Sequence, residues 1–403
     1  ISASGQDITL DETASTFGSL LLTGANVAVT DAGAVDLGAS TVSGTLGIIS
    51  AGAVTDSGTL AITGATTISA SGQDITLDEA ASTFGTLALT GANVAVTENA
   101  ATDLGASTIS GTFAITSGGA ITDSGTQAIT GDATFTNTAG TDDAITLDDA
   151  SNAFGGTVTF ATDSGSAVTI VDTTALDLVA LTAASLSATS GGAVTDSGTL
   201  AIAGATTISA SGQDITLDES ASTFGTLALT GENVAVTENA ATDLGASTVG
   251  GTLGITSAGA VTDSGTLAVT GATTISASGQ DITLDQASST FGTLALTGAN
   301  VAVTENAATD LGASTVSGTF AITSGGAITD SGTQAITGDA TFTNTAGTDA
   351  AITLDDASND FGGTVTFAAD SGSAVTIVDI TALDLKALTA ASLSATAGGA
   401  VTD

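Results

Sequence analysis

Short runs of alternating apolar and polar residues recur along the chain. In the run 86–90, Leu87 and Leu89 lie on one face of an extended backbone, because successive side chains of a strand point to opposite sides. The run 94–97 repeats the pattern with Val94 and Val96. Gly, Asn, Asp and Ser separate these runs and favour tight turns. The pattern therefore predicts many half-buried strands of three to five residues.

A longer repeat organises these strands. The segment ISASGQDITLDE begins at Ile1, Ile68 and Ile208, and ISASGQDITLDQ begins at Ile275. A more divergent module opens with FTNTAGTDDAITLDDASNAFGG at Phe135, and a close copy begins at Phe342. We therefore expect one continuous solenoid over residues 1–403, built from modules 1–67, 68–134, 135–207, 208–274, 275–341 and 342–403, the last incomplete.

Each module contains a shorter period that indicates the coil of a β-helix. Anchor glycines such as Gly18, Gly38 and Gly58 recur at an even spacing, and a longer step leads to Gly85 of the next module. A segment of about 20 residues with two or three strands cannot bury its apolar face alone and must stack on its neighbours. The predicted fold is all-β, a right-handed parallel β-helix of about 18 coils. Right-handed winding is favoured because left-handed solenoids keep a strict hexapeptide period.

Two further expectations concern rival folds and the chain ends. An immunoglobulin-like array needs domains of about 100 residues and usually a buried Trp, and this chain has no Trp. Both ends fall within a repeat, and neither shows a segment that could cap the solenoid. We expect the solenoid to be uncapped at both ends, either continuing in a longer protein or stacking end to end on another copy.

Six phenylalanines each precede an anchor glycine, and neighbouring coils carry Leu37 or Leu104 at that place. A stacked interior column explains this pattern, whereas an aromatic strip for sugar stacking would be expected to use Trp or Tyr. The six residues are Phe17, Phe84, Phe154, Phe224, Phe291 and Phe361.

Composition excludes several classes of partner. One Lys or Arg stands against 42 Asp and Glu, giving a formal net charge of -41. Nucleic acid and anionic membrane surfaces both require clustered cationic side chains. The longest apolar runs are too short for membrane insertion. With 42% hydrophobic residues the chain can still bury a core, and the absence of Cys leaves the redox compartment undetermined.

Two columns of acidic residues are the candidate metal-binding positions. If coils stack in register at the anchor glycines, aspartates two residues before each anchor form pairs about 4.8 Å apart. Carboxylates that close must raise a pKa, turn into water or share a cation, and oxygen-only ligands suit Ca²⁺. The alternative is a solvated acidic face that keeps the protein soluble. The predicted metal positions are Asp36, Asp56, Asp103, Asp123, Asp177, Asp196, Asp243, Asp263, Asp310 and Asp330.

A second acidic column lies seven residues before the anchors and favours the same two interpretations. Its members are Asp11, Asp31, Asp78, Glu98, Asp148, Asp172, Asp218, Glu238, Asp285, Glu305, Asp355 and Asp379. No EF-hand loop and no tandem calcium-binding nonapeptide accompanies either column. No cofactor is required by this sequence, and Ca²⁺ is the one that it allows.

Catalysis is not expected. The chain has no His and no Cys, and Lys386 is its single Lys or Arg, so it offers no imidazole base, thiol nucleophile or cationic oxyanion partner. Carboxylate pairs alone can hydrolyse glycosidic bonds, but here they recur along the chain, whereas an active site is normally one asymmetric pocket. Outward Thr residues could bind ice, but the Thr-Ala-Thr pattern and unequal coils disfavour a flat lattice.

The short coil period, strands of the type Gly-Thr-Leu-Ala-Ile-Thr and turns of the type GGAVTDSG resemble the repeat region of large bacterial exoproteins of the filamentous haemagglutinin type. The resemblance implies a right-handed β-helical region exported by two-partner secretion or an autotransporter-like route, with roles in adhesion and biofilm. It carries over no functional residue and no host or surface ligand.

These observations favour a non-catalytic, extracellular shaft of a secreted or surface-anchored bacterial adhesin. The alternative is a filament or sheath protein that associates with itself laterally or end to end, cross-bridged by divalent cations.

Overall fold

A computed structural model describes residues 1–138, 140, 142–345 and 349–403. The chain folds into two compact units, Ile1–Ala203 and Gly204–Asp403. Each is an all-β parallel solenoid, and the described residues contain no helix. The fold matches the predicted right-handed β-helix, with about 20 turns instead of 18. A single continuous solenoid over 1–403 stays a prediction, and part of the divergent module opening (residues 139, 141 and 346–348) lies outside the described residues.

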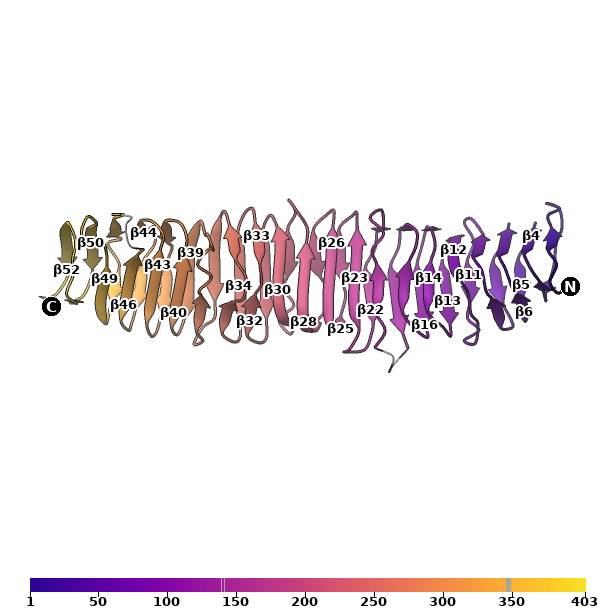
Figure 1. The fold of residues 1–403 in the computed structure, drawn as a ribbon, viewed down its shortest axis with the longest axis horizontal. Helices are drawn as coiled ribbons and strands as arrows, with labels where there is room; N and C mark the ends of the chain where they lie inside the picture. Colours follow the sequence, from indigo (N-terminus) through magenta and orange to yellow (C-terminus); the bar gives the residue numbers. More distant parts are fainter. Residues whose placement is uncertain (139, 141, 346–348) are drawn as a thin grey trace. The chain divides into compact units, whose positions relative to one another are not determined.

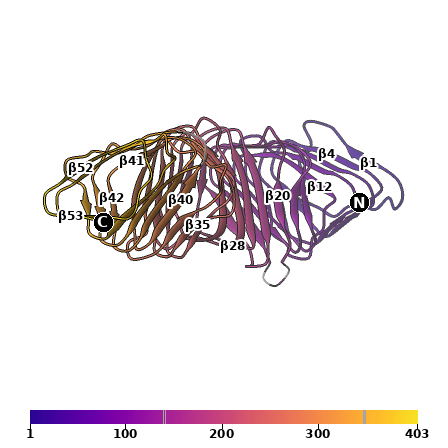
Figure 2. The ribbon, with the colours of Figure 1, turned by 60° about the vertical axis from the view of Figure 1, so that its left-hand side comes forward.

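One turn of the solenoid contains one long strand and two short ones. In the second module, β13 (Val94–Glu98) is followed by β14 (Thr102–Leu104) and β15 (Ser107–Ile109). The next turn repeats this order, and each strand pairs in parallel with its counterpart one turn away. We call the stacked long strands the wide wall and the two stacks of short strands the bent wall. Within each unit, neighbouring turns lie side by side (Figure 1) and enclose a common interior (Figure 2).

The strands of the first unit are β1 (Ile8–Leu10), β2 (Ser19–Leu20), β3 (Thr23–Gly24), β4 (Val27–Asp31), β5 (Val35–Leu37), β6 (Ser40–Val42), β7 (Leu46–Ser50), β8 (Val54–Asp56), β9 (Leu60–Ile62), β10 (Thr66–Ser69), β11 (Ile75–Leu77), β12 (Thr86–Gly91), β13, β14, β15, β16 (Phe113–Ser117), β17 (Ile121–Asp123), β18 (Gln127–Ile129), β19 (Ala133–Asn137), β20 (Ile145–Leu147), β21 (Ala153–Phe154), β22 (Val158–Ala161), β23 (Ala167–Asp172), β24 (Leu176–Leu178), β25 (Leu181–Ala183), β26 (Ser185–Ser190) and β27 (Val194–Asp196).

The chain enters the second unit within β28 (Leu200–Ser209). The strands that follow are β29 (Ile215–Leu217), β30 (Thr223–Gly231), β31 (Val234–Glu238), β32 (Thr242–Leu244), β33 (Ser247–Val249), β34 (Leu253–Ser257), β35 (Val261–Asp263), β36 (Leu267–Val269), β37 (Ala272–Ser276), β38 (Ile282–Leu284), β39 (Thr293–Gly298), β40 (Val301–Glu305), β41 (Thr309–Leu311), β42 (Ser314–Val316), β43 (Phe320–Ser324), β44 (Ile328–Asp330), β45 (Gln334–Ile336), β46 (Ala340–Asn344), β47 (Ile352–Leu354), β48 (Asp360–Phe361), β49 (Thr364–Ala368), β50 (Ala374–Asp379), β51 (Leu383–Leu385), β52 (Ser392–Ala397) and β53 (Val401–Thr402).

A module makes three and a half turns, not three. Pairing leads from β1 through β4, β7, β10, β12, β14 and β17 to β20, so seven steps separate the corresponding ITL strands of the first and third modules. The intermediate copy of that strand, β11, pairs with β8 and β13 in the other large sheet. Consecutive modules of the first unit therefore place their wide walls on different sides of the solenoid. The extra half turn in each module explains why there are more turns than predicted.

The interior consists of the alternate residues that face inward from both walls. The prediction that the phenylalanines are interior is confirmed for Phe84, Phe154, Phe224, Phe291 and Phe361, which are buried. The exception is Phe17, which is half-exposed. The predicted stacking on Leu104 is wrong, because Leu104 pairs with Leu87 of the preceding turn. Phe154 instead follows Ile129 and packs edge-on against Phe135, with ring centroids 6.0 Å apart.

Some anchor glycines are required by close backbone packing. A Cβ on Gly85 would lie 2.6 Å from the carbonyl oxygen of Gly64 in the preceding turn. Real side chains do not approach a carbonyl so closely, and the carbonyl belongs to backbone that cannot swing away. This corner of the solenoid can turn tightly only because both residues are glycine.

Candidate functional site

The predicted aspartate pairs are not brought together. Asp36 pairs with Thr55, whereas Asp56 pairs with Leu37, so the two carboxylates are offset by one residue. The same offset separates the pairs that begin at Asp103, Asp177, Asp243 and Asp310. A shift of one residue moves a side chain to the opposite face of a strand. The first member of each pair therefore points outward and the second inward, which corrects the predicted 4.8 Å stacking.

The outward aspartates bind hydroxyl groups of neighbouring turns. The Asp103 Oδ2 accepts hydrogen bonds from the Thr86 hydroxyl at 2.8 Å and the Ser124 hydroxyl at 2.9 Å. Asp243 and Asp310 repeat this arrangement with their own Thr and Ser partners. Asp36 accepts from Ser57, and Asp177 from Thr195. These carboxylates connect adjacent turns through hydroxyl groups.

The inward aspartates hold the backbone of the following turn. The Asp56 Oδ1 accepts a hydrogen bond of 2.8 Å from the backbone N–H of Asp78. Asp123, Asp263 and Asp330 make the equivalent bond at the same distance. Asp196 is also buried. Burial is the main cause that raises the pKa of Asp56 and of Asp263, and it outweighs the backbone hydrogen bonds that lower it.

The second acidic column contains the most deeply buried carboxylates. Its alternate members lie inside the solenoid and include Glu98, which is 2% exposed. The Glu98 Oε1 accepts a hydrogen bond of 2.7 Å from the backbone N–H of Phe84, and its Oε2 lies 3.0 Å from the Thr102 hydroxyl. Asp31, Asp172, Glu238 and Glu305 bind the backbone N–H of the corresponding phenylalanine in their modules. Asp379 is buried at the equivalent position.

Burial raises the pKa of four carboxylates of this column. It raises the pKa of Glu98 to about 7, although the bonds from Phe84 and Thr102 favour the charged form. Burial likewise raises the pKa of Asp172, Glu238 and Glu305. Removing a carboxylate from water disfavours its charged form, and the chain has almost no cationic side chains to compensate. The interior of the solenoid therefore contains acids with raised pKa values, and Glu98 is the one that titrates near neutral pH.

The role of these carboxylates as buried acceptors for backbone N–H groups is not predicted from the sequence, because both acidic columns are interpreted there as surface positions. Asp and Glu are rarely buried, and an acidic column normally reads as a solvated face. A usable signal was present, since the interval from Phe84 to Glu98 is the same as the interval from Phe17 to Asp31. In four modules the acid comes 14 residues after the phenylalanine whose backbone N–H it binds, and an interval that recurs in this way indicates a structural contact.

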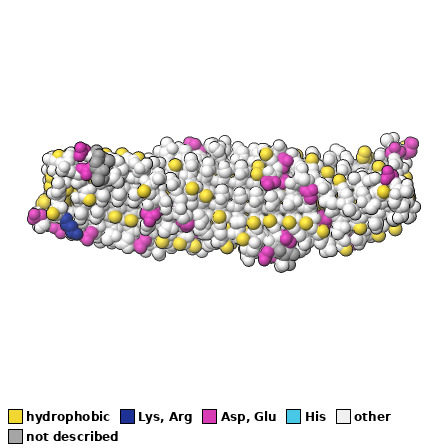
Figure 3. Space-filling model, in the orientation of Figure 1, with side chains coloured by type: hydrophobic (Ala, Val, Ile, Leu, Met, Phe, Trp, Pro, Cys, Tyr) yellow, Lys and Arg dark blue, Asp and Glu magenta, His cyan; other side chains and the backbone are white. Residues whose placement is uncertain are grey.

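No metal centre is apparent among the described residues, where no group of three or more His, Cys, Asp or Glu side chains could hold an ion. The acidic side chains on the face drawn in Figure 3 form small separate groups and no continuous strip. Calcium binding at the ten predicted aspartates stays a prediction, without the paired geometry on which it was based. Over the part of the chain that the structure describes, no helix has the length and apolarity to cross a membrane.

Five segments of the chain match one family, described as repeats of unknown function (DUF5649). The matches cover residues 24–90, 91–161, 165–230, 231–297 and 298–368, which is more than four fifths of the chain. The chain belongs to the DUF5649 family. Each DUF5649 match has nearly the length of one module of three and a half turns. The matches begin inside the modules and not at the module boundaries used above. No curated protein and no solved structure matches the chain.

Proposed function

We propose that this chain is a non-catalytic structural repeat solenoid that forms part of the extracellular shaft of a large bacterial adhesin. The observation that carries the proposal is that the carboxylates accept hydrogen bonds from neighbouring turns. Glu98 binds the N–H of Phe84, Asp56 binds that of Asp78, and Asp103 binds hydroxyl groups of adjacent turns. The acidic groups thus connect consecutive turns instead of converging on one pocket.

A spacer function agrees with this construction. Each turn pairs with the turn before and after it, so stability accumulates along the stack and the number of modules can vary without a new fold. Each module adds three and a half turns, or about 17 Å of length at about 4.8 Å per stacked strand. A shaft of this kind would hold an adhesive segment at a distance set by the module count.

The experiment combines surface labelling with module deletion in the producing bacterium. Antibodies against the repeats should label intact cells, and electron microscopy should show separate cell-anchored projections that shorten by about 17 Å for each deleted module. The matched control deletes an equal number of residues outside the repeats. Exclusively intracellular labelling, or an unchanged projection length after deletion, would contradict the shaft.

Self-association into a filament or sheath is the second candidate, and the surface of the wide walls favours it. The outward positions of β4, β7, β10, β13, β16 and β19 carry only Ala, Thr, Gly, Ile and Ser. A chain with a net charge of -41 repels its copies except where the contact surface lacks charge. Continuous periodic fibres in the native material, instead of separate projections, would favour this candidate.

A further inference from the structure

One wide wall differs from the others at an outward surface position. In the first module, β7 presents Gly47 and Ile49 outward. The corresponding pairs are Ala114 and Thr116 in the second module, Gly254 and Thr256 in the fourth, and Ala321 and Thr323 in the fifth. Ile49 is 58% exposed, whereas large aliphatic side chains of this solenoid usually face the interior. The first module therefore exposes an apolar side chain where other modules carry threonine.

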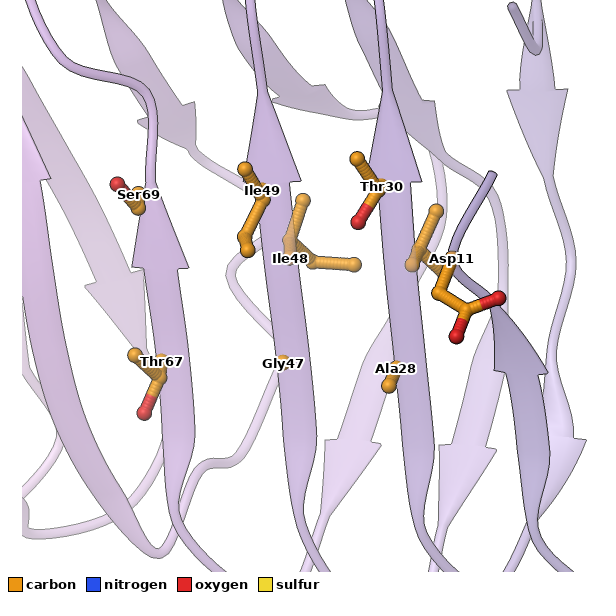
Figure 4. Close-up of a pocket in the computed structure, with 9 residues that line it drawn as sticks. Asp11, Ala28, Thr30, Gly47, Ile48, Ile49, Thr67 and Ser69 are labelled. Carbon is orange, nitrogen blue, oxygen red and sulfur yellow. The ribbon is translucent and has the colours of Figure 1, made fainter. Parts of the chain in front are cut away.

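A hollow lies beside this side chain. Gly47 pairs with Ala28 of β4 and Thr67 of β10, so the three strands carry small or no side chains in one row. In Figure 4 these residues lie side by side, and Thr30, Ile49 and Ser69 form the next row. The hollow has a volume of about 420 Å³. Asp11 lines its rim.

An apolar knob next to a hollow, on a wall without outward charge, is self-complementary. When two copies face each other across a twofold axis, residue i of one contacts residue j of the other, and the reverse contact occurs at the same time. The Ile49 side chain of each copy would then enter the partner's hollow over Gly47. The surrounding outward residues are Ala, Thr and Ser, so the contact brings no like charges together except the two Asp11 side chains at the rim.

We propose that the wide wall of the first module is a self-association surface, on which Ile49 of one chain packs into the Gly47 hollow of a second copy. The proposal concerns the pairing of two chains and does not depend on the adhesin shaft. By itself it gives a closed dimer, because a twofold contact does not extend into a filament. The successive strands β1, β4, β7 and β10 cover about 19 Å by about 17 Å. The area of this surface is well below the roughly 800 Å² per partner of a standard interface. The contact is therefore weak, and dimers are expected only at high protein concentration.

The test uses variants that introduce residues the fold already accepts at equivalent positions. Sedimentation of the purified chain up to millimolar concentration should show a monomer–dimer equilibrium. Ile49→Thr removes the knob and Gly47→Ala reduces the hollow, and each should weaken dimerisation at least tenfold. Circular dichroism and thermal melting verify that both variants fold. The control Thr97→Ser changes an outward residue of β13, which belongs to the other large sheet, and should dimerise as the original chain does.

A gain-of-function variant makes the test stricter. Ala114→Gly with Thr116→Ile builds the same knob and hollow on the second module, whose wide wall belongs to the other large sheet. This double variant should form assemblies larger than dimers, because each chain then has two contact surfaces on different sides. A chain that stays monomeric, or a dimer unaffected by Ile49→Thr and Gly47→Ala, would overturn the proposal. Separate projections on cells would refute the filament but leave this dimer to be measured in solution.

Discussion

The buried glutamates predict that mild acid stabilises this protein. Glu98 titrates with a pKa of about 7 in the folded protein against an ordinary value of 4.5. Between these two values the folded state binds more protons than the unfolded state, so the free energy of unfolding increases as the pH falls. The gain in the free energy of unfolding is complete below pH 4.5, the pKa of Glu98 in the unfolded chain. It is lost as the pH rises through about 7.

The magnitude follows from the size of the shift. One pKa unit corresponds to about 1.36 kcal/mol, so the rise from 4.5 to about 7 is worth up to about 3 kcal/mol for Glu98. In a unit of this size, each kcal/mol changes the melting temperature by about 2–4 °C. Glu238 and Glu305 lie in the same environment in the second unit, and burial raises the pKa of both. The effect should therefore be visible in both units.

The assay is thermal melting by circular dichroism between pH 5 and pH 8 for the original chain and for Glu98→Gln. The amide keeps an oxygen for the Phe84 N–H but carries no charge, so the variant should melt higher than the original at pH 8. The difference should shrink towards zero at pH 5. Glu12→Gln, at an exposed position, makes the same change in net charge and is the control. Equal shifts for the two variants at every pH, or destabilisation by Glu98→Gln at pH 8, would refute the reasoning.

Three further predictions concern packing and calcium. Phe154→Ala should reduce the free energy of unfolding by about 3–5 kcal/mol in denaturant titration, because Phe154 is fully buried against Phe135, whereas Phe17→Ala should cost much less. Gly85→Ala should reduce the free energy of unfolding by about 1–3 kcal/mol through its clash with the Gly64 carbonyl. Gly47→Ala, whose Cβ would be 3.8 Å from its nearest neighbour, should be close to neutral. Similar losses of stability in the two variants would contradict the packing argument. If the acidic positions bind Ca²⁺, added calcium should raise the melting temperature and a chelator should lower it, while coincident melting curves would rule out calcium binding.

The strands and the interior were predictable because a strand buries alternate residues. Leu87, Leu89, Val94 and Val96 all lie in the interior, as the period of two requires. The repeat length was equally visible. These features depend on local chemistry, and each strand encodes them in its own residues.

Register was not predictable from the anchor glycines. Aligning the anchors Gly38 and Gly58 would place Leu37 against Ser57, but the ladder places Leu37 against Asp56, one residue earlier. The small residues at the corners permit several backbone paths, so a shift of one residue is possible there. The shift places the second aspartate of each pair on the opposite face of the strand from the first. The number of turns failed for a related reason, because a sequence repeat measures recurrence of residues and does not require a whole number of turns.

The half turn in each module also has a consequence for how such proteins change over time. Within one unit, recombination between near-identical modules can insert or remove one copy while each turn still has a neighbouring turn with which to pair. An odd change in module number then turns the surfaces of the following modules of that unit to the other side of the solenoid, and an even change restores them. Two related proteins that differ by a single repeat could thus present the same residues in opposite directions, so that parity of the repeat count becomes a heritable property of the surface.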